Sequence, residues 1–368
     1  MKLGIDVSTY FEELEAGVKY FIKGKEVEPL DEFVNNGVRY SRIRLWNNPF
    51  SLDGKPYLGG TCDLNNFLKL SKLMINKGYE IILDIHYSDF WADPGKQTLP
   101  KAWANLTFEE LKKEVYKFTK ETLETIKKEG IKLSHIQIGN EITNGFMWPI
   151  GRLNENGDKE RTNYENFTAL LKEGIKATRE LMPETKIIIH LERSYDIKIY
   201  DEVFSNLKKY DVDYDFIGMS YYPYWHRSFD ELFANVEFCR NKFGKNVIIA
   251  EVGYGFTMED YIKNNNGQPQ LKIDVNSGEY YVPYPLTKEG QKEFVKEFIK
   301  RSIEHNIEMA IYWEPIWISG KNICWASVEG QEYINEVGKE TRNEWANQCL
   351  FDYEGEATPA FYEYKVKN

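Results

Sequence analysis

The chain has 368 residues, of which 42% are hydrophobic and 15% aromatic, so it can bury a large core and is not an intrinsically disordered protein. Its net charge is −11, from 47 basic and 58 acidic residues, and no cluster of lysine and arginine could neutralise a run of phosphates. We therefore expect no nucleic-acid partner. No apolar stretch is long enough to span a membrane, so no membrane association is expected either.

Compartment and redox state are only loosely constrained. No signal peptide precedes the first apolar run at residues 3–8, which is consistent with a cytoplasmic protein or with the trimmed, mature form of a secreted one. The four cysteines, at positions 62, 239, 324 and 349, lack the CxxC spacing of a zinc site. We expect free thiols, with a disulfide between Cys324 and Cys349 as the alternative.

Eight short apolar segments have the length expected of buried parallel strands. They lie at residues 3–8, 40–46, 80–87, 135–141, 186–191, 215–223, 247–254 and 309–316. Segments with helical periodicity and charged outer faces separate them, for example at residues 63–78, 107–130 and 164–182. Asp63 and Thr107 are predicted to cap two of these helices, and Gly78 and Gly130 to end them.

This alternation of strand and helix, repeated eight times, is typical of a closed (β/α)₈ TIM barrel or of an open doubly wound sheet. Two features favour the barrel. No glycine-rich phosphate loop follows the first strand, and polar or aromatic residues gather at the C-terminal ends of nearly all the strands. We predict one α/β domain, a (β/α)₈ barrel over residues 1–368, with long loops after the seventh and eighth strands. The longest irregular stretch, residues 258–285, follows the seventh strand.

Active-site residues of barrel enzymes gather at the C-terminal ends of the strands, so the side chains found there are the candidates for chemistry. They are Asp6, Arg44, His86, Asn140, Glu141, His190, Tyr221, Tyr222, Glu251, Trp313 and Glu314.

Glu141 and Glu251 differ from the others because each ends a strongly apolar strand, where a carboxylate is costly unless the strand opens into a polar cavity. They end the fourth and the seventh predicted strands, which face each other across the mouth of a closed barrel. Two carboxyl groups could then approach to about 5 Å, the spacing at which a retaining glycosidase uses one as nucleophile and the other as acid/base. The alternative is that each glutamate pairs with a cation such as Arg44 or caps a following helix.

Neighbouring residues weaken that alternative. Asn140, beside the predicted acid, can hydrogen-bond a sugar hydroxyl near the reacting carbon. Arg44 is predicted to lie beside Glu251 and keep it ionised, while a more desolvated Glu141 retains its proton and acts as the acid.

Tryptophans provide a second indication, because indole rings in a cleft suit the apolar faces of pyranose rings. Most of the nine tryptophans lie in loops or at strand ends rather than inside helices. We expect Trp91 and Trp313 to contact sugar, and Trp317 and Trp345 only to cover the rim of the barrel.

Metal catalysis and serine catalysis are poorly supported. The five histidines include no HxH or HExxH arrangement, so no metal site is predicted. His86 and His190 are expected to orient carboxylates or sugar hydroxyls. No GxSxG motif is present, which disfavours a serine esterase of the common fold.

With these residues in place, the chain resembles glycoside hydrolase family 53, the endo-β-1,4-galactanases that cut the galactan side chains of pectin. The longest matching motif is LDIHYSDFWADPGKQTLPKAW at residues 83–103. Others follow in the expected order: RIRLWNNP (42–49), QIGNEITNGFMWPIG (137–151), DFIGMSYYPYW (215–225), AEVGY (250–254) and YWEPIW (312–317). The resemblance extends from GIDVS at residues 4–8 to FDYEG at residues 351–355.

This resemblance implies a (β/α)₈ barrel of the large retaining-glycosidase clan, which hydrolyses β-1,4-galactan through a covalent glycosyl-enzyme intermediate. It implies that Glu141 of GNE is the acid/base and that Glu251 of AEVGY is the nucleophile. The supporting residues that it implies are Arg44, His86, Asn140 and Tyr222, and the substrate-contacting residues are Asp89, Trp91 and Trp313. A polysaccharide is the implied partner, no cofactor is required, and a monomer is expected.

Three segments depart from the family pattern. Val252, Gly253 and Tyr254 stand where the family often has a Thr-Ala-Tyr-like run, and HLERSYD at residues 190–196 replaces an HLDNG-like run. Both changes fall near sugar-binding subsites. Bacterial members can bind calcium, and the loop after the seventh strand supplies the oxygen donors Asp260, Asn264, Asn265, Asn266 and Asp274. These lack the fuller ligand pattern, so structural calcium is not predicted.

Two other functions stay open from the sequence. A shared barrel does not determine the polymer, so the substrate could be another β-glycan such as mannan or glucan. A barrel that binds carbohydrate in its aromatic cleft without cutting it belongs to a different class, and the intact Glu141, Asn140 and Glu251 argue against it.

Overall fold

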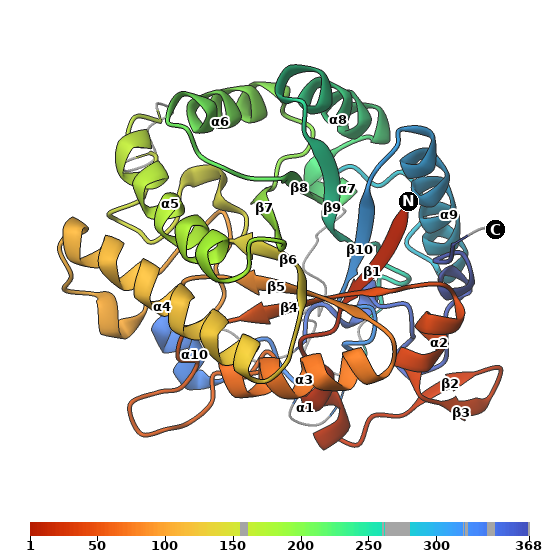
Figure 1. The fold of residues 1–368 in the computed structure, drawn as a ribbon. Helices are drawn as coiled ribbons and strands as arrows, with labels where there is room; N and C mark the ends of the chain where they lie inside the picture. Colours follow the sequence, from red (N-terminus) through yellow and green to blue (C-terminus); the bar gives the residue numbers. More distant parts are fainter. Residues whose placement is uncertain are drawn as a thin grey trace.

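The structure is a computed structural model that describes residues 1–154, 161–259, 261, 280–318, 320, 323–336 and 343–366. Eight parallel strands form a closed barrel, which confirms the predicted (β/α)₈ architecture (Figure 1). The strands are β1 (Lys2–Asp6), β4 (Tyr40–Leu45), β5 (Glu80–Ile85), β6 (Leu133–Ile138), β7 (Lys186–Leu191), β8 (Phe216–Tyr221), β9 (Asn246–Val252) and β10 (Met309–Trp313). The barrel closes where β1 pairs with β10, with Gly4 opposite Ile311.

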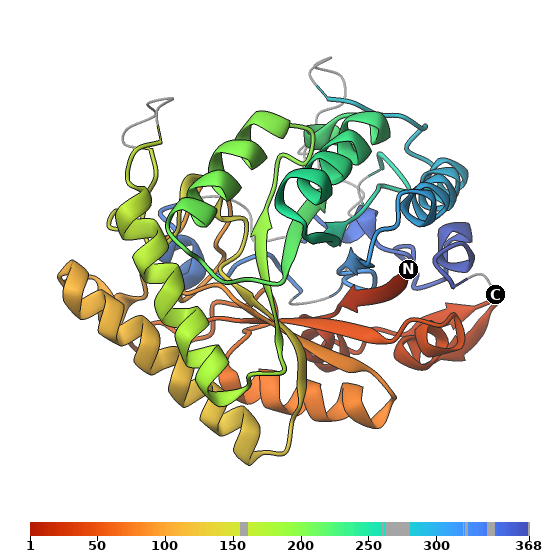
Figure 2. The same ribbon diagram turned by 45° about the horizontal axis from the view of Figure 1, so that its top comes forward.

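Helices cover the outside of the barrel, as Figures 1 and 2 show from two directions. The longer ones are α3 (Leu64–Asn76), α4 (Phe108–Lys128), α5 (Tyr164–Leu181), α6 (Ile197–Lys209), α8 (Phe229–Phe243) and α9 (Lys288–Glu304). Shorter helices are α1 (Tyr10–Glu15), α2 (Pro29–Asn35), α7 (Pro223–His226) and α10 (Val328–Tyr333).

The predicted helix ends are confirmed. Asp63 accepts a hydrogen bond from the backbone N–H of Asn66 at 2.8 Å, and Thr107 forms a reciprocal capping box with Glu110. The glycines that follow α3 and α4 adopt left-handed conformations, with φ values of 93° at Gly78 and 74° at Gly130.

One element was not predicted. A small antiparallel hairpin, β2 (Tyr20–Ile22) and β3 (Lys25–Val27), lies between α1 and α2 outside the barrel. Three-residue strands are too short to establish a two-residue period in the sequence. The turn between them is formed by Lys23 and Gly24, both with positive φ, as tight two-residue hairpin turns require.

Apolar and polar layers divide the barrel interior. A buried cluster fills its lower part: Tyr40, Ile82, Ile188, Ile248, Met309 and Ile311. Strand side chains alternate between faces, so residues two and four positions further along point the same way. Two or four positions beyond Tyr40, Ile82 and Ile188, the sequence has polar residues that point into the barrel: Arg42, Arg44, Asp84, His86 and His190. The interior of the barrel is therefore polar at its C-terminal end and apolar below it.

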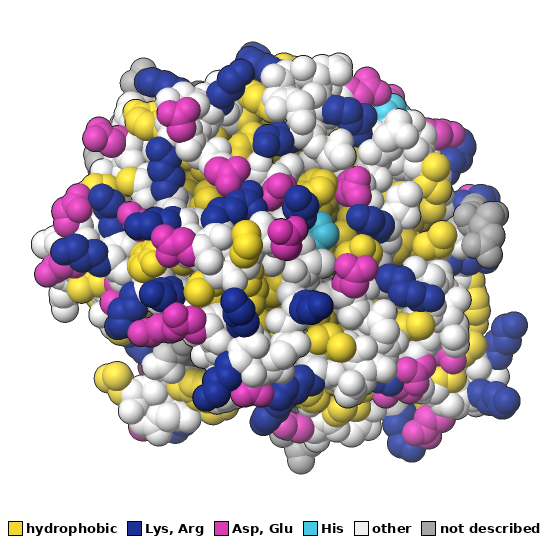
Figure 3. Space-filling model, in the orientation of Figure 1, with side chains coloured by type: hydrophobic (Ala, Val, Ile, Leu, Met, Phe, Trp, Pro, Cys, Tyr) yellow, Lys and Arg dark blue, Asp and Glu magenta, His cyan; other side chains and the backbone are white. Residues whose placement is uncertain are grey.

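The remaining sequence predictions concern thiols and the surface. All four cysteines are buried free thiols, so the alternative disulfide between Cys324 and Cys349 is not formed. On the face seen in Figure 3, acidic and basic side chains are interspersed. None of the helices in the described part of the chain is both long and apolar enough to cross a membrane.

Candidate active site

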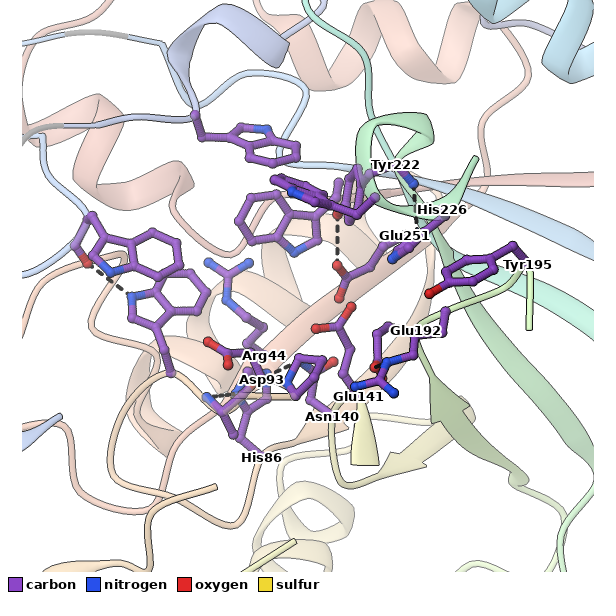
Figure 4. A pocket seen from close by; sticks show the side chains of 18 residues that line it. Arg44, His86, Asp93, Asn140, Glu141, Glu192, Tyr195, Tyr222, His226 and Glu251 are labelled. Atoms are coloured by element: carbon purple, nitrogen blue, oxygen red, sulfur yellow. Dashed lines mark hydrogen bonds and ion pairs between the residues drawn. The ribbon is translucent and has the colours of Figure 1, made fainter. Parts of the chain in front are cut away.

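A cavity of about 480 Å³ opens at the C-terminal ends of the barrel strands (Figure 4). Eight of the nine predicted site residues line it: Arg44, His86, Trp91, Asn140, Glu141, Tyr222, Glu251 and Trp313. They come from six different barrel strands and the segments that directly follow them, which is the arrangement typical of catalytic barrels.

The two predicted catalytic carboxylates face each other in the centre of this cavity (Figure 4). One carboxylate oxygen of Glu141 lies within 4.8 Å of one carboxylate oxygen of Glu251. Glu141 follows β6 and Glu251 belongs to β9, the fourth and seventh strands of the barrel. The predicted approach of these two strand ends across the barrel mouth is confirmed.

Local backbone geometry turns Glu141 toward the cavity. Gly139 has a φ of 80°, and a Cβ at this position would lie 2.7 Å from Cγ2 of Ile142, so only glycine fits. Glu141 itself has a φ of 49° and begins the short 3₁₀ turn Ile142–Asn144. A non-glycine residue in this left-handed region costs about 1–2 kcal/mol. Such strain is typical of functional sites, and here it directs the carboxylate of Glu141 into the pocket.

Arg42, rather than Arg44, is the cation beside Glu251, which corrects the sequence-based assignment. Arg42 Nη1 lies 3.1 Å from Glu251 Oε1, and the hydroxyl of Tyr222 donates a hydrogen bond of 2.7 Å to Glu251 Oε2. Burial raises the pKa of Glu251, while Arg42 and the hydrogen bond from Tyr222 act in the opposite direction. Both partners therefore favour the ionised form of Glu251.

Arg44 serves a different part of the same pocket. Its guanidinium lies 3.2 Å from Asp6 and 2.7 Å from Glu314, so it already has two carboxylate partners. The guanidinium carbon also lies 4.6 Å from the ring centroid of Trp91 and 5.3 Å from that of Trp313. Arg44 thus holds two indole rings in place through cation–π contacts.

Glu141 has the environment of a proton donor. Ser220 Oγ lies 2.6 Å from Glu141 Oε1. Burial raises the pKa of Glu141 well above its ordinary value, and the negative charges of Glu251 and Glu192 raise it further, whereas a hydrogen bond donated by Ser220 would lower it. Two neighbouring carboxyl groups with such different partners are suited to different roles, one protonated and one ionised.

Asn140 and His86 are held by several hydrogen bonds. Asn140 Oδ1 accepts from Arg42 Nη2 at 2.9 Å, and its Nδ2 donates to the carbonyl of Ala92 at 2.9 Å. His86 Nε2 lies 3.0 Å from Asp84 Oδ2, and its Nδ1 accepts from Trp46 Nε1 at 3.2 Å. Both side chains line the cavity in one defined orientation.

Asp89 is the predicted site residue that the structure does not bring to the cavity. It is buried, and its carboxylate accepts hydrogen bonds from the backbone N–H groups of Asn48, at 3.0 Å, and Lys101, at 2.8 Å. The ammonium of Lys101 lies 2.7 Å from the same carboxylate. These contacts tie two loops together and hold the Asp89 carboxylate outside the cavity.

Tryptophans form one wall of the cavity. Trp325 stacks on Trp91 with ring centroids 4.3 Å apart, and Trp345 packs edge-on against Trp313 at 4.5 Å. Trp345 was expected only to cover the rim but lines the cavity. A Cβ at Gly253 would lie 2.8 Å from the Trp345 ring, so the glycine after Val252 permits this approach. Trp317 is fully buried.

Sequence reasoning missed four residues that line the cavity: Glu192, Arg193 and Tyr195, which follow β7, and His226 in α7. Glu192 accepts a hydrogen bond from the hydroxyl of Thr143, and its carboxylate lies 3.0 Å from Arg193 Nε. Burial raises the pKa of Glu192 to about 7. For Glu192, Arg193 and Tyr195 the only signal was the unusual HLERSYD run.

A metal site is not assigned here. Within the described ranges, Glu141, His190 and Glu251 are the residues whose ligand-type atoms cluster, and Arg42 already supplies a cation to Glu251. The oxygen donors considered for calcium, Asp260, Asn264, Asn265, Asn266 and Asp274, lie outside the described residues.

A (β/α)₈ barrel that presents two facing carboxylates and an aromatic wall at the ends of its strands has the architecture of a glycoside hydrolase. The model of glycosyl hydrolase family 53 matches residues 2–363, and the chain belongs to this family.

Individual relatives agree with this assignment. The endo-beta-1,4-galactanase of Bacillus subtilis is 32% identical over 97% of this chain and 83% of that protein. The arabinogalactan endo-beta-1,4-galactanase A of Aspergillus niger is 29% identical over 86% of this chain and 85% of that protein. Among solved structures, the GH53 catalytic domain of Ignisphaera aggregans superposes with a TM-score of 0.86 and 33% identity, covering 98% of this chain and 94% of that one.

Proposed function

We propose that the protein is a retaining, endo-acting hydrolase of β-1,4-galactosidic linkages in galactan and arabinogalactan. The observation that carries this proposal is the approach of the Glu141 and Glu251 carboxylate oxygens to within 4.8 Å. Retaining enzymes hold their carboxyl groups about 5–5.5 Å apart, whereas inverting enzymes need about 6.5–9.5 Å to admit a water molecule. The relatives named as endo-beta-1,4-galactanases support galactan as the polymer.

In the first step, Glu251 attacks the anomeric carbon while Glu141 gives its proton to the leaving glycosidic oxygen. The bond between the anomeric carbon and the leaving oxygen breaks, and a covalent ester links the sugar to Glu251. In the second step, Glu141, now ionised, takes a proton from water, and the water oxygen attacks the anomeric carbon and releases Glu251. Two inversions restore the original configuration.

The other residues that line the cavity bind and orient the sugar. Nδ2 of Asn140 has two hydrogens, of which one is donated to Ala92, so the second is available to a sugar hydroxyl. Trp91 and Trp313 offer indole faces to the apolar faces of pyranose rings. We propose further that the chain works as one catalytic domain, as a monomer and without a required cofactor.

Incubation with linear β-1,4-galactan, followed by sizing of the released oligosaccharides, tests the proposal. We expect fragments of intermediate length early in the reaction, and NMR should detect the β-anomer of the new reducing end before mutarotation. Initial release of the α-anomer would contradict retention. Unchanged hydrolysis by Glu251→Gln would contradict the assignment of the nucleophile.

A panel of mannan, β-glucan and galactan, read by the formation of reducing ends, identifies the polymer. Faster hydrolysis of mannan or glucan than of galactan would contradict the proposed substrate and would leave the mechanism intact. Binding of glycan without any product would favour a carbohydrate-binding barrel.

A further inference from the structure

A series of hydrogen-bond contacts inside the barrel connects Glu141, the proposed acid, to Arg42. Ser220 Oγ lies 2.6 Å from Glu141 Oε1 and 2.9 Å from His190 Nε2. His190 Nδ1 lies 3.0 Å from Asn140 Oδ1, which in turn accepts from Arg42 Nη2 at 2.9 Å. Ser220 and His190 are fully buried, so bulk solvent does not reach the contact between them.

Arg42 determines the direction of the hydrogen bonds at its end of the series. A guanidinium only donates, and Gln137 Nε2 also points at Asn140 Oδ1, at 3.1 Å. The orientation of Gln137 is itself set, because its Oε1 accepts from Arg42 Nε at 3.2 Å. The oxygen of the Asn140 amide therefore faces these donors, and its Nδ2 faces the carbonyl of Ala92.

This orientation determines the tautomer of His190. Because Asn140 Oδ1 is an acceptor, His190 Nδ1 must carry a hydrogen to bond it at 3.0 Å. Burial lowers the pKa of His190 well below its ordinary value, and the positive charge of Arg42 lowers it further, so the ring is neutral. Nε2 is then a bare acceptor. The single proton of the Ser220 hydroxyl must point at Nε2, which leaves a lone pair of Ser220 facing Glu141.

We propose that Ser220 and His190 are positioning residues that favour the protonated form of Glu141 in the free enzyme. With Glu141 protonated, each contact has one donor and one acceptor: Glu141 donates to Ser220, Ser220 to His190, and His190 to Asn140. With Glu141 ionised, Ser220 must turn to donate to the carboxylate. Two lone pairs, on Ser220 Oγ and His190 Nε2, then face each other across 2.9 Å. Ionisation of Glu141 therefore costs free energy for this lost hydrogen bond in addition to the cost of burying its charge.

This inference rests on the proposed role of Glu141 as the acid, to which it adds a device that keeps the proton in place until substrate arrives. The glycosidic oxygen then replaces Ser220 as the acceptor of that proton. Other charged or titratable groups surround the pair: Arg42, Asp84, His86 and His226 around His190, and Glu251, Glu192 and Asp93 around Glu141. In the described part of the chain, Ser220 is the hydrogen-bond partner of His190 Nε2.

The tautomer can be measured without any assay of hydrolysis, by NMR of the full chain labelled with ¹⁵N-histidine. The His190 signals are assigned by their loss in His190→Gln. We expect a neutral ring protonated at Nδ1 and bare at Nε2 at neutral pH. A ring protonated at Nε2 would overturn the proposal, because His190 would then donate to Ser220. This result stands whether or not the protein hydrolyses galactan.

The pH dependence of kcat/KM then tests the effect on the acid, because its alkaline limb reports the acid of the free enzyme. In Ser220→Ala we expect this limb to move to lower pH by about 0.5–1 unit, the value of one hydrogen bond. A shift to higher pH would mean that Ser220 serves the ionised carboxylate and would overturn the proposal, as would no shift.

Two further variants separate this effect from general damage. Ser220→Thr keeps a hydroxyl and should keep the limb at the wild-type position. Ser41→Ala is the matched control, since Ser41 is a buried barrel serine whose hydroxyl has no hydrogen-bond partner among the described residues. A limb that moves equally in Ser41→Ala would overturn the proposal. If Ser220→Ala does not fold, the NMR measurement on the wild type still decides it.

Discussion

Arg42 and Glu251 form a buried ion pair, with Nη1 of the arginine 3.1 Å from Oε1 of the glutamate. Arg42 also lies 2.9 Å from Asp6 and 2.8 Å from Asp84, so one guanidinium serves three carboxylates. The planar, multidentate shape of a guanidinium makes this arrangement possible, and an ammonium could not reproduce it.

Replacement of Arg42 by lysine should therefore impair catalysis and stability together. We expect Arg42→Lys to lower kcat about 100-fold and to lower the free energy of unfolding by about 3–5 kcal/mol, because one ammonium cannot contact all three buried carboxylates and leaves at least one of them without its partner. Galactan hydrolysis and urea unfolding provide the measurements. Arg44→Lys is the comparison, and a larger loss of kcat in that variant would restore the sequence-based pairing of Arg44 with Glu251.

Neutralising Glu192 should shift the pH range of activity. The charge of Glu192 raises the pKa of Glu141, and activity is lost as the pH rises through that pKa because the acid loses its proton. We expect Glu192→Gln to move the alkaline limb of kcat/KM to lower pH by about 0.5–1 unit. Glu202→Gln serves as control, since Glu202 lies in α6 outside the cavity. An unchanged alkaline limb of kcat/KM in Glu192→Gln would contradict the effect of Glu192 on the pKa of Glu141.

Buried carboxyl groups should make the protein less stable at alkaline pH. Burial raises the pKa of Glu192 from 4.5 to about 7 and that of Glu314 from 4.5 to about 8. Across this window the folded state binds more protons than the unfolded state, so the free energy of unfolding falls as the pH rises. We expect this contribution to the Tm to be present at pH 5 and lost by pH 8, measured by scanning calorimetry. The buried histidines His135, His190 and His226, whose pKa values are lowered, act in the opposite direction, so the comparison is made between the wild type and a variant. Glu192→Gln should reduce the fall of Tm between pH 5 and pH 8. An unaltered fall would contradict the raised pKa of Glu192.

Trp345 should contribute to substrate binding although it lies almost 100 residues after Glu251 in the chain. Its ring packs against Trp313 and, at 5.3 Å, against Tyr222. We expect Trp345→Ala to raise the KM for galactan about tenfold, the value of one lost aromatic contact. Trp345→Phe should recover part of the binding. Trp103→Phe, at a buried tryptophan outside the cavity, should leave KM unchanged.

Asp89 should act on stability rather than on binding. Its carboxylate joins the backbone of Asn48 to Lys101 and is out of reach of the cavity. We expect Asp89→Asn to lower the free energy of unfolding by about 1–3 kcal/mol and to leave KM nearly unchanged. Denaturation and steady-state kinetics on the same preparation check both parts. A large rise in KM at wild-type stability would support the substrate contact that the family resemblance implies.

Several features of this protein follow from its sequence alone because they depend on neighbours in the chain. Short, nearly continuous apolar runs identify eight strands, and Asp63 and Thr107 cap their helices through atoms three residues away. The approach of Glu141 to Glu251 depends instead on the order of the strands. Once a closed barrel of eight strands is assumed, the fourth and seventh strands lie three positions apart around it, so side chains at their ends can meet across its mouth.

Tertiary structure alone decided the contacts that depend on how strands and loops lie in space. Arg42 and Arg44 both point into the barrel because they are two residues apart, and only the register of β4 against its neighbours determines which one reaches Glu251. The proposed position of the His190 ring hydrogen, on Nδ1, likewise depends on Arg42, which is distant in sequence and orients the Asn140 amide. Such choices depend on differences of a few ångströms between packed elements, and a one-dimensional pattern does not record them.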